Sequence, residues 1–232
     1  MSGILYGVGV GPGDPKLMTL LAVETIEKCP VIAVPADSRK LAVSYRIAEK
    51  MINGMEEKEC LTLSIPMTKD QQILKEKYKQ DAELIIQRLK DGRDVAYLTI
   101  GDPTIYSTYI YLHRLIREQG YPAEIINGIP SFCAAAARVG ESLADRSEQL
   151  HIIPSNYEIE KALEYPGSKV LMKAGSKLSF VKQILKEKET EGIMVENCGF
   201  PDEQIYYDMD RAPEKTSYYT TILVRQKQEK EG

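Results

Sequence analysis

The feature that most constrains this chain is a short apolar run that ends abruptly at a glycine, an aspartate and a proline. Residues 95–100 follow a polar break and have the length and composition of a strand buried on both faces. Gly101 and Pro103 end that strand, and Pro103 fixes φ for a first helical turn, so a helix is expected from Thr104. Asp102 would then present a carboxylate at the carboxyl end of a strand, which is where ligands bind in an open α/β sheet. The alternative is an ordinary strand-to-helix turn in which Asp102 only caps the helix.

Composition places the chain among ordinary soluble globular proteins. Its 232 residues are 43% hydrophobic and carry a net charge of −4. That length suffices for one large α/β domain or for two of about 110 residues each. The mild acidity argues against binding nucleic acid through phosphate neutralisation. The first residues show no secretory signal and no run is long enough to span a membrane, which favours a cytoplasmic protein without membrane contact.

The four cysteines and two histidines show no metal-binding or catalytic spacing. The cysteines are far apart in sequence, which disfavours a zinc site and a disulfide framework, so we interpret all of them as structural thiols. They are Cys29, Cys60, Cys133 and Cys198. His113 falls in a helical pattern and His151 begins an expected strand, so neither a nucleophilic Cys/His pair nor a metal site is indicated.

The amino-terminal strand leads into another glycine-rich exit. Residues 4–15, Ile-Leu-Tyr-Gly-Val-Gly-Val-Gly-Pro-Gly-Asp-Pro, leave the backbone open to close approach. The pattern departs from the dinucleotide-binding fingerprint because Pro12 and Pro15 delay the helix to about Thr19, which can cap it. No Gly-Lys-Ser/Thr follows, as a Walker-type phosphate loop requires. For this loop alone, the alternative is a tight strand exit that binds no ligand.

Strand-like and helical patterns alternate through the first half of the chain, which predicts a parallel sheet built from βαβ units. After the first strand, further strands are expected at 31–35, 59–65, 95–100 and 123–126. The second half changes character, with strands expected at 149–154, 169–173, 192–196 and 218–224, a short one at 206–209, and a helix at 178–188. We therefore expect two α/β domains, residues 1–127 and residues 128–232.

Three glycine-bearing strand exits are thus predicted, at residues 7–14, 101–103 and 128–131. In a doubly wound sheet the carboxyl ends of parallel strands lie at one edge, so these loops are expected to open together toward the second domain. The joint pattern is more specific than any one of its parts.

These residues resemble the class III S-adenosylmethionine-dependent methyltransferases that modify tetrapyrroles. Residues 8–14 look like the proline-glycine loop of that family, Gly101-Asp102-Pro103 with Ser107 like its second motif, and residues 128–132 like its third. The third motif departs from the usual Pro-Gly, since this chain has Asn127-Gly128. Within the family, four segments look most like the enzymes that methylate C20 of precorrin-2 or of its cobalt form, in cobalamin biosynthesis. They are 65–68, 101–109, 171–173 and 219–224.

The resemblance implies a cytoplasmic homodimer of two α/β domains, the first with a parallel sheet and the second with a mixed sheet, and a ligand cleft between them. It implies S-adenosyl-L-methionine as methyl donor and a small-molecule tetrapyrrole as substrate. The positions implied to hold the donor are Pro12, Gly101, Asp102, Ile105, Pro130, Ser131, Met172, Lys173, Ala174, Thr220, Thr221 and Ile222.

Physical roles can be assigned to several of these positions. Asp102 would accept from the donor's amino group or ribose, Ile105 and Met172 would form apolar walls, and strand backbone near Thr221 would pair with the adenine edge. The sulfonium methyl is already activated, so in-line alignment with the acceptor carbon would supply much of the rate.

Other residues are candidates for acting on the tetrapyrrole itself. Candidates for the base that removes the C20 proton are Tyr109, Tyr219 and Asp37, each with a structural role as its alternative. Candidates for binding substrate carboxylates are Arg39, Lys40, Arg46, Lys173 and Lys177, each with solvated surface charge as its alternative.

Two other functions remain open at this point. One is a sister tetrapyrrole methyltransferase acting at another carbon. The other is a non-catalytic nucleotide-binding α/β module.

Overall fold

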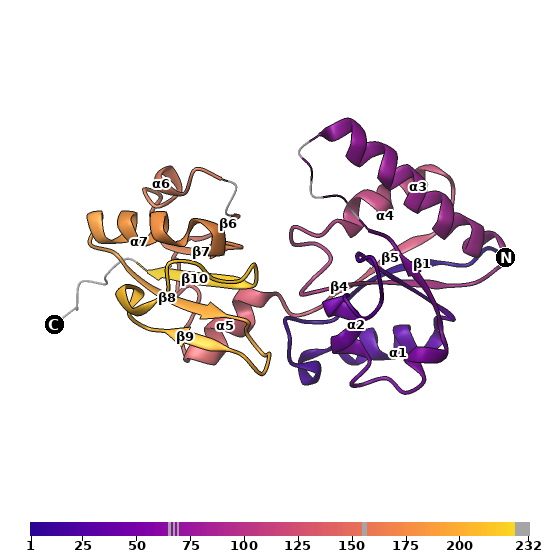
Figure 1. Cartoon of the computed structure of the whole chain (residues 1–232), viewed down its shortest axis with the longest axis horizontal. Helices are drawn as coiled ribbons and strands as arrows, with labels where there is room; N and C mark the ends of the chain where they lie inside the picture. The colour runs from indigo at the N-terminus through magenta and orange to yellow at the C-terminus, as the bar shows by residue number, and fades with distance from the viewer. Residues whose placement is uncertain (65, 67, 69, 155–156, 226–232) are drawn as a thin grey trace. The chain divides into compact units, whose positions relative to one another are not determined.

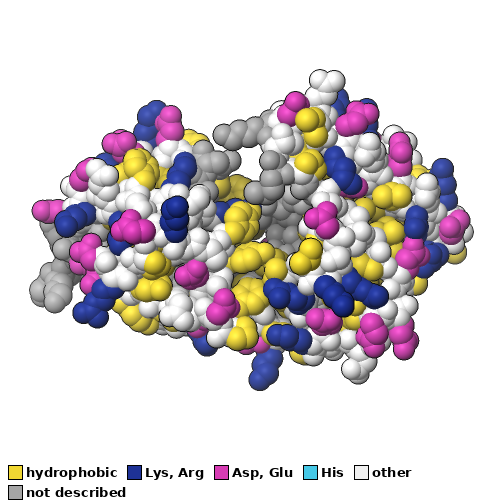
Figure 2. Space-filling model, in the orientation of Figure 1, with side chains coloured by type: hydrophobic (Ala, Val, Ile, Leu, Met, Phe, Trp, Pro, Cys, Tyr) yellow, Lys and Arg dark blue, Asp and Glu magenta, His cyan; other side chains and the backbone are white. Residues whose placement is uncertain are grey.

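The computed structural model describes residues 1–64, 66, 68, 70–154 and 157–225. It divides into two compact units, unit 1 from Met1 to Pro130 and unit 2 from Ser131 onward, so the division follows Pro130 rather than residue 127. Each unit contains one five-stranded sheet with helices on both of its faces (Figure 1). Figure 2 shows Lys and Arg side chains interspersed with Asp and Glu over the face in view.

Unit 1 is the parallel α/β domain that the alternating patterns predict. Its strands are β1 (Leu5–Gly9), β2 (Val31–Val34), β3 (Glu59–Thr62), β4 (Val95–Thr99) and β5 (Ala123–Ile126). Its helices are α1 (Leu20–Lys28), α2 (Val43–Ala48), α3 (Gln71–Lys90) and α4 (Tyr109–Glu118). All strands are parallel in the order β3-β2-β4-β1-β5, which confirms the expected parallel sheet. Position 65, the end of the expected strand at 59–65, lies outside the described residues.

Side-chain caps mark the starts of two helices of unit 1. Thr19 caps α1, as expected, since its hydroxyl accepts from the Ala22 N–H at 3.1 Å. Asp70 caps α3 in the same way, accepting from the N–H groups of Gln72 and Ile73. Before α1, Asp14 holds a single 3₁₀ turn over Pro15–Leu17, which the sequence patterns do not predict.

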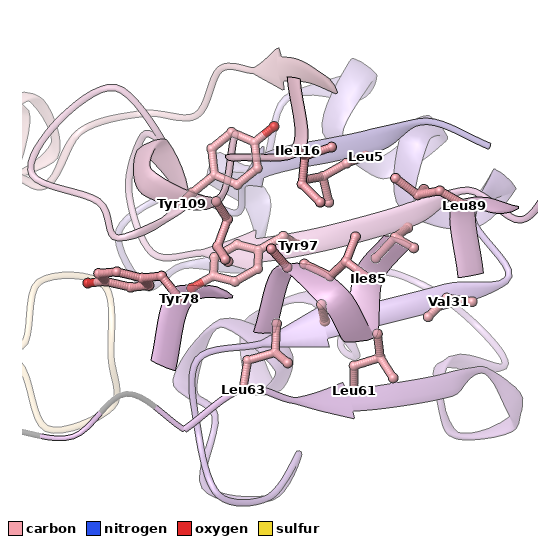
Figure 3. Close-up of a cluster of buried hydrophobic side chains, with 14 residues drawn as sticks. Leu5, Val31, Leu61, Leu63, Tyr78, Ile85, Leu89, Tyr97, Tyr109 and Ile116 are labelled. Atoms are coloured by element: carbon pink, nitrogen blue, oxygen red, sulfur yellow. The ribbon is translucent and has the colours of Figure 1, made fainter. Parts of the chain in front are cut away.

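One hydrophobic cluster of unit 1 lies between the sheet and helices α3 and α4, while α1 and α2 cover the opposite face (Figure 1). Figure 3 shows Tyr97 of β4 and Tyr109 of α4 close together in this cluster, with Ile85 and Leu89 of α3 packed over the same face. The Tyr97 and Tyr109 ring centroids are 5.6 Å apart, and both side chains are fully buried. Successive apolar side chains of a buried parallel strand point to opposite faces of the sheet, so each strand packs against helices on both faces.

The expected helix start at Thr104 is wrong, because α4 begins at Tyr109. The intervening residues form a turn in which Tyr106 has φ of +49°. The Ser107 hydroxyl holds this turn, lying 3.0 Å from the Thr99 hydroxyl and accepting from the Tyr109 N–H at 3.2 Å. Proline sets a helical φ locally, but these side-chain bonds favour a compact loop.

Unit 2 contains the expected mixed sheet. Its strands are β6 (Leu150–Pro154), β7 (Ser168–Met172), β8 (Glu191–Glu196), β9 (Gln204–Tyr206) and β10 (Thr220–Arg225). Its helices are α5 (Ser131–Val139), α6 (Ile159–Ala162) and α7 (Leu178–Glu187). In the order β6-β7-β10-β8-β9, only the β6–β7 pair is parallel.

Three details of unit 2 differ from expectation. The short strand expected at 206–209 lies at 204–206, and Met209 instead begins a 3₁₀ turn capped by Asp208. The last strand begins at Thr220, not at residue 218. The sequence patterns also do not predict α6. Together with α7, this helix covers the sheet face opposite α5 (Figure 1).

Within the described part of the chain, no helix combines the length and apolarity that a membrane crossing requires.

Gly7→Ala is expected to lower the free energy of unfolding of unit 1 by about 2 kcal/mol through overpacking. A Cβ at this position would lie 2.1 Å from Cε1 of the Tyr109 ring. That ring has little room to move, because it is fully buried and its hydroxyl donates to the Glu124 carbonyl at 2.6 Å. Urea denaturation measures the cost. In a Tyr109→Ala background the same glycine change should cost much less, and equal costs in both backgrounds would exclude this contact as the cause.

Candidate functional site

The three glycine-bearing exits of unit 1 meet at one edge of the sheet, as the strand pattern predicts. β1 lies between β4 and β5, so the loops that follow these three strands are neighbours. Beyond the strands, the Gly101 N–H donates to the Gly11 carbonyl at 2.8 Å, and the Gly11 N–H donates back at 3.3 Å. The first and second loops are therefore joined through their backbones.

The approach of the loops is close enough to require glycine. A Cβ on Gly9 would lie 2.5 Å from the Gly101 carbonyl oxygen and 2.7 Å from the Gly128 nitrogen. A Cβ on Gly128 would lie 2.2 Å from that same carbonyl oxygen. Gly101 itself has φ of +71°, which disfavours other residues. These glycines make one compact backbone cluster, which we call the glycine cluster: Gly9, Gly11, Gly101 and Gly128.

Asp102 joins the second loop to the third through its carboxylate. Oδ1 accepts from the Thr104 N–H at 2.7 Å and from the Thr104 hydroxyl. Oδ2 accepts from the Asn127 side-chain amide at 3.0 Å and from the Gly128 N–H at 3.0 Å. The residue is 6% exposed. A carboxylate offers about four lone-pair positions, so this one is saturated within the protein.

The same bonds set the charge of Asp102. Burial acts to raise the pKa of this carboxyl, but the hydrogen bonds from Thr104, Asn127 and Gly128 outweigh it and hold the pKa below its ordinary value. Asp102 is therefore ionised at neutral pH. The alternative in which it only caps a helix is wrong, since Thr104 begins no helix and two of its four bonds go to residues after β5.

Asn127 is a member of this network that sequence reasoning did not single out. It is 25 residues from Asp102 in the chain, and its amide orients toward the carboxylate only when β4 and β5 lie on either side of β1. The available signal was an amide side chain directly before Gly128 at a strand exit.

The remaining unit 1 candidates lie around the same loops. Pro12 is buried directly after Gly11, and the Ile105 N–H donates to the Asp102 carbonyl at 3.2 Å. Pro130 is half-buried at the end of the third loop. The structure thus brings Pro12, Gly101, Asp102 and Ile105 together within unit 1.

The unit 2 candidates gather where β7 ends and β10 begins. Met172 lies directly opposite Thr221 in the antiparallel register, and the Lys173 N–H donates to the Thr220 carbonyl at 3.0 Å. Ala174 and Ile222 are fully buried in the cluster under α6 and α7. Ser131 begins α5. Lys173 has φ of +59°, an unusual conformation for a lysine that turns the chain sharply after β7.

The structure disfavours Tyr109 as a base. Its hydroxyl donates to the Glu124 carbonyl at 2.6 Å within the unit 1 core, and burial raises its pKa well above the ordinary value. Among the proposed carboxylate-binding side chains, Arg39 donates to the Glu56 carbonyl at 2.9 Å, and Lys173 lies over the Tyr218 ring. Among the described residues, no three His, Cys, Asp or Glu side chains are placed to hold a metal ion.

Comparison with known proteins places this chain in a family. The family profile described as Tetrapyrrole (Corrin/Porphyrin) Methylases matches residues 4–210. A protein of Methanocaldococcus jannaschii named probable cobalt-precorrin-2 C(20)-methyltransferase is 36% identical over 203 residues, covering 87% of this chain and 85% of that protein. The cobalt-precorrin-2 C(20)-methyltransferase of Salmonella typhimurium is 29% identical over 241 residues, covering 99% of both chains.

Solved structures share the fold. A cobalt precorrin-4 methyltransferase has a TM-score of 0.76 at 22% identity, covering 96% of this chain and 94% of that chain. A uroporphyrin-III C-methyltransferase from Thermus thermophilus, complexed with S-adenosyl homocysteine, has a TM-score of 0.71 at 18% identity, covering 97% and 98%. With the profile matching most of the chain and a relative above 30% identity over most of its length, this chain belongs to the tetrapyrrole (corrin/porphyrin) methylases.

Proposed function

We propose that this enzyme transfers a methyl group from S-adenosyl-L-methionine to C20 of precorrin-2 or of its cobalt form, a step of cobalamin biosynthesis. The observation that carries the proposal is similarity over nearly the whole chain to relatives named for that reaction. A relative named for C11 methylation of cobalt-precorrin-4 also covers 87% of this chain, but it is 25% identical where the C20 relative with the same coverage is 36% identical. Sequence identity therefore favours C20 over the sister reaction.

In unit 1, the donor contacts are proposed at the glycine cluster and the residues beside it. The carboxyl edge of an open parallel sheet binds ligands because loop N–H groups and small residues leave room for them. The proposed contacts in this part are Pro12, Gly101, Ile105 and Pro130, and Asp102 belongs to the set as the residue that positions them. Because all four acceptor positions of Asp102 are filled, its role is to position the second and third loops rather than to touch the donor.

In unit 2, the proposed donor residues are Ser131, Met172, Lys173, Ala174, Thr220, Thr221 and Ile222. β10 pairs with β7 on one side and with β8 on the other, so the Thr221 peptide groups lie within the sheet ladder. Met172 and Thr221 project to one face of the sheet as a cross-strand pair, and they would offer an apolar wall with a hydroxyl beside it.

Little acid chemistry is needed from the protein in this reaction. The donor supplies an activated methyl group on a cationic sulfur. The protein's part is to hold the acceptor carbon in line with that methyl, exclude water and accept the departing C20 proton. A rigid loop edge suits the first task, because misplacement of a reacting atom by about 1 Å can cost about 100-fold in rate.

We further propose that the protein acts as a homodimer in the cytoplasm. Family membership supports both statements, and the acidic, mixed-charge composition fits a soluble enzyme. Light scattering after size-exclusion chromatography should give twice the chain mass of 26.1 kDa. A monomer mass across micromolar concentrations would contradict the dimer.

The proposed reaction is tested by supplying donor with a ¹³C-labelled methyl group to metal-free precorrin-2 and to its cobalt form in parallel. One new methyl group is expected, located at C20 by NMR and counted by mass spectrometry, and the faster substrate identifies the natural form. Methylation at another carbon would indicate the sister reaction. If calorimetry detects no S-adenosylhomocysteine binding but tight binding of NAD or ATP, the chain is a nucleotide-binding module instead.

Asp102→Asn is expected to weaken S-adenosylhomocysteine binding by about tenfold, because displaced loops lose donor contacts. The free energy of unfolding should also fall by about 2 kcal/mol. The asparagine amide has one acceptor oxygen where the carboxylate has two, and its NH₂ group would face N–H groups that also donate. Asp70→Asn, at the cap of α3, is the matched control and should leave donor affinity unchanged. Unchanged donor affinity in Asp102→Asn would remove this residue from the site.

The stability of the wild-type protein should decline in acid partly through Asp102. Its folded-state pKa is lowered, so its stabilising contribution is complete above the ordinary aspartate value of about 3.9 and is lost as pH falls through the folded-state value. Asp102→Asn should therefore lose less stability than the wild type as pH falls from about 4. Urea midpoints across this range measure the difference, and parallel curves would contradict it.

A further inference from the structure

Unit 2 exposes two neighbouring tyrosines directly before β10. Tyr218 is 57% exposed and Tyr219 is 37% exposed, although large aromatic side chains are normally more buried. Their rings meet edge to face with centroids 5.5 Å apart, and Phe200 lies 6.1 Å from the Tyr219 ring. The Lys173 ammonium is 5.1 Å from the centre of the Tyr218 ring. We call these four residues the aromatic–lysine cluster.

The backbone under this cluster is held firmly. The Ser217 N–H donates to the Glu196 carboxylate at 2.7 Å, and the Ser217 hydroxyl donates to the Asn197 side chain at 2.8 Å. The Thr220 hydroxyl donates to the Ser217 carbonyl at 2.9 Å. These hydrogen bonds fix the backbone of the segment that carries the two tyrosines, and so fix the positions from which the exposed rings project.

Lys173 is brought to the same place by close backbone contact. Its N–H is bonded to the Thr220 carbonyl, and a Cβ added at Gly175 would lie 2.2 Å from the Ser217 carbonyl oxygen. The turn after β7 therefore lies in close backbone contact with the segment before β10. Its positive φ at Lys173 directs the side chain toward Tyr218 instead of along the strand.

We propose that Tyr218 and Lys173 form a subsite for the tetrapyrrole substrate, a statement that rests on the function proposed above. The flat, apolar macrocycle would lie against the exposed Tyr218 ring, and one of its peripheral carboxylates would take the Lys173 ammonium from that ring. Continuity supports this assignment, since Lys173 directly follows Met172 of the proposed donor site. Charge supports it as well, because an ammonium beside an aromatic face matches a ligand that is both planar and anionic.

A carboxylate is a stronger partner for the ammonium than an exposed aromatic face, so the exchange on binding is favourable. The Tyr218 side chain should therefore act on the substrate and not on the methyl donor. Lys173 also belongs to the proposed donor set, so its side chain is assigned a role in substrate binding without a claim on the donor KM. The two side chains should also differ in their response to salt, because only the lysine works through charge.

The test is steady-state methylation of precorrin-2, with Michaelis constants measured separately for tetrapyrrole and donor. Tyr218→Ala should raise KM for the tetrapyrrole about fivefold, through loss of aromatic contact, with the donor KM unchanged. Tyr218→Phe should restore the wild-type value. Lys173→Gln should raise the tetrapyrrole KM about threefold at low salt and not at about 1 M salt, where charge is screened. Tyr207→Ala, at a more exposed tyrosine of unit 2, is the matched control.

An unchanged tetrapyrrole KM in Tyr218→Ala would overturn the proposal, and so would a rise confined to the donor KM. Direct binding of uroporphyrin III, a planar octacarboxylate, separates this proposal from the proposed function. If the wild type fails to methylate precorrin-2, weaker uroporphyrin binding by Tyr218→Ala and Lys173→Gln would still support the subsite. Equal binding by wild type and both variants would overturn it.

Discussion

The structure of unit 1 depends on one carboxylate placed where three loops meet. Asp102 follows a fully buried strand, and its two oxygens accept four hydrogen bonds from residues after β4 and β5. An ionised group that is 6% exposed would be costly without such partners, and here each lone-pair position is used. These four hydrogen bonds therefore both stabilise the charge of Asp102 and fix the spacing between the loops.

The glycine cluster makes that spacing possible. With side chains at Gly9 or Gly128, the loops would meet the Gly101 carbonyl before Asp102 could reach the Gly128 N–H. The glycines therefore serve loop-to-loop contact in the first place, and any room for a ligand lies beyond that contact. This differs from a phosphate-binding loop, in which glycines open the backbone directly to the ligand. It also explains why the first loop resembles the dinucleotide fingerprint only in composition.

The sequence predicts the sheets well because their strands are short apolar runs bounded by polar breaks, as residues 95–100 illustrate. Prediction from the sequence fails where a hydrogen bond to a residue on another element decides the local backbone geometry. The start of α4 depends on the bond between Ser107 and Thr99, and the role of Asn127 depends on strand order. Likewise, Tyr218 and Tyr219 have the composition of a strand, but Ser217 and Asn197 hold this segment outside β10. Family resemblance, in contrast, supplied the proposed reaction, which residue patterns alone left open.

We propose that Asp102 positions the proposed donor-binding loops without touching the donor. NMR titration of a ¹³C-labelled Asp102 carboxyl carbon, with and without saturating S-adenosylhomocysteine, tests it most directly. We expect a pKa below the ordinary aspartate value that barely changes on binding, because the four partners of the carboxylate stay in place. A further marked fall in the pKa on binding would show a direct bond to the ligand's ammonium group, and would rule out a purely positioning role for Asp102.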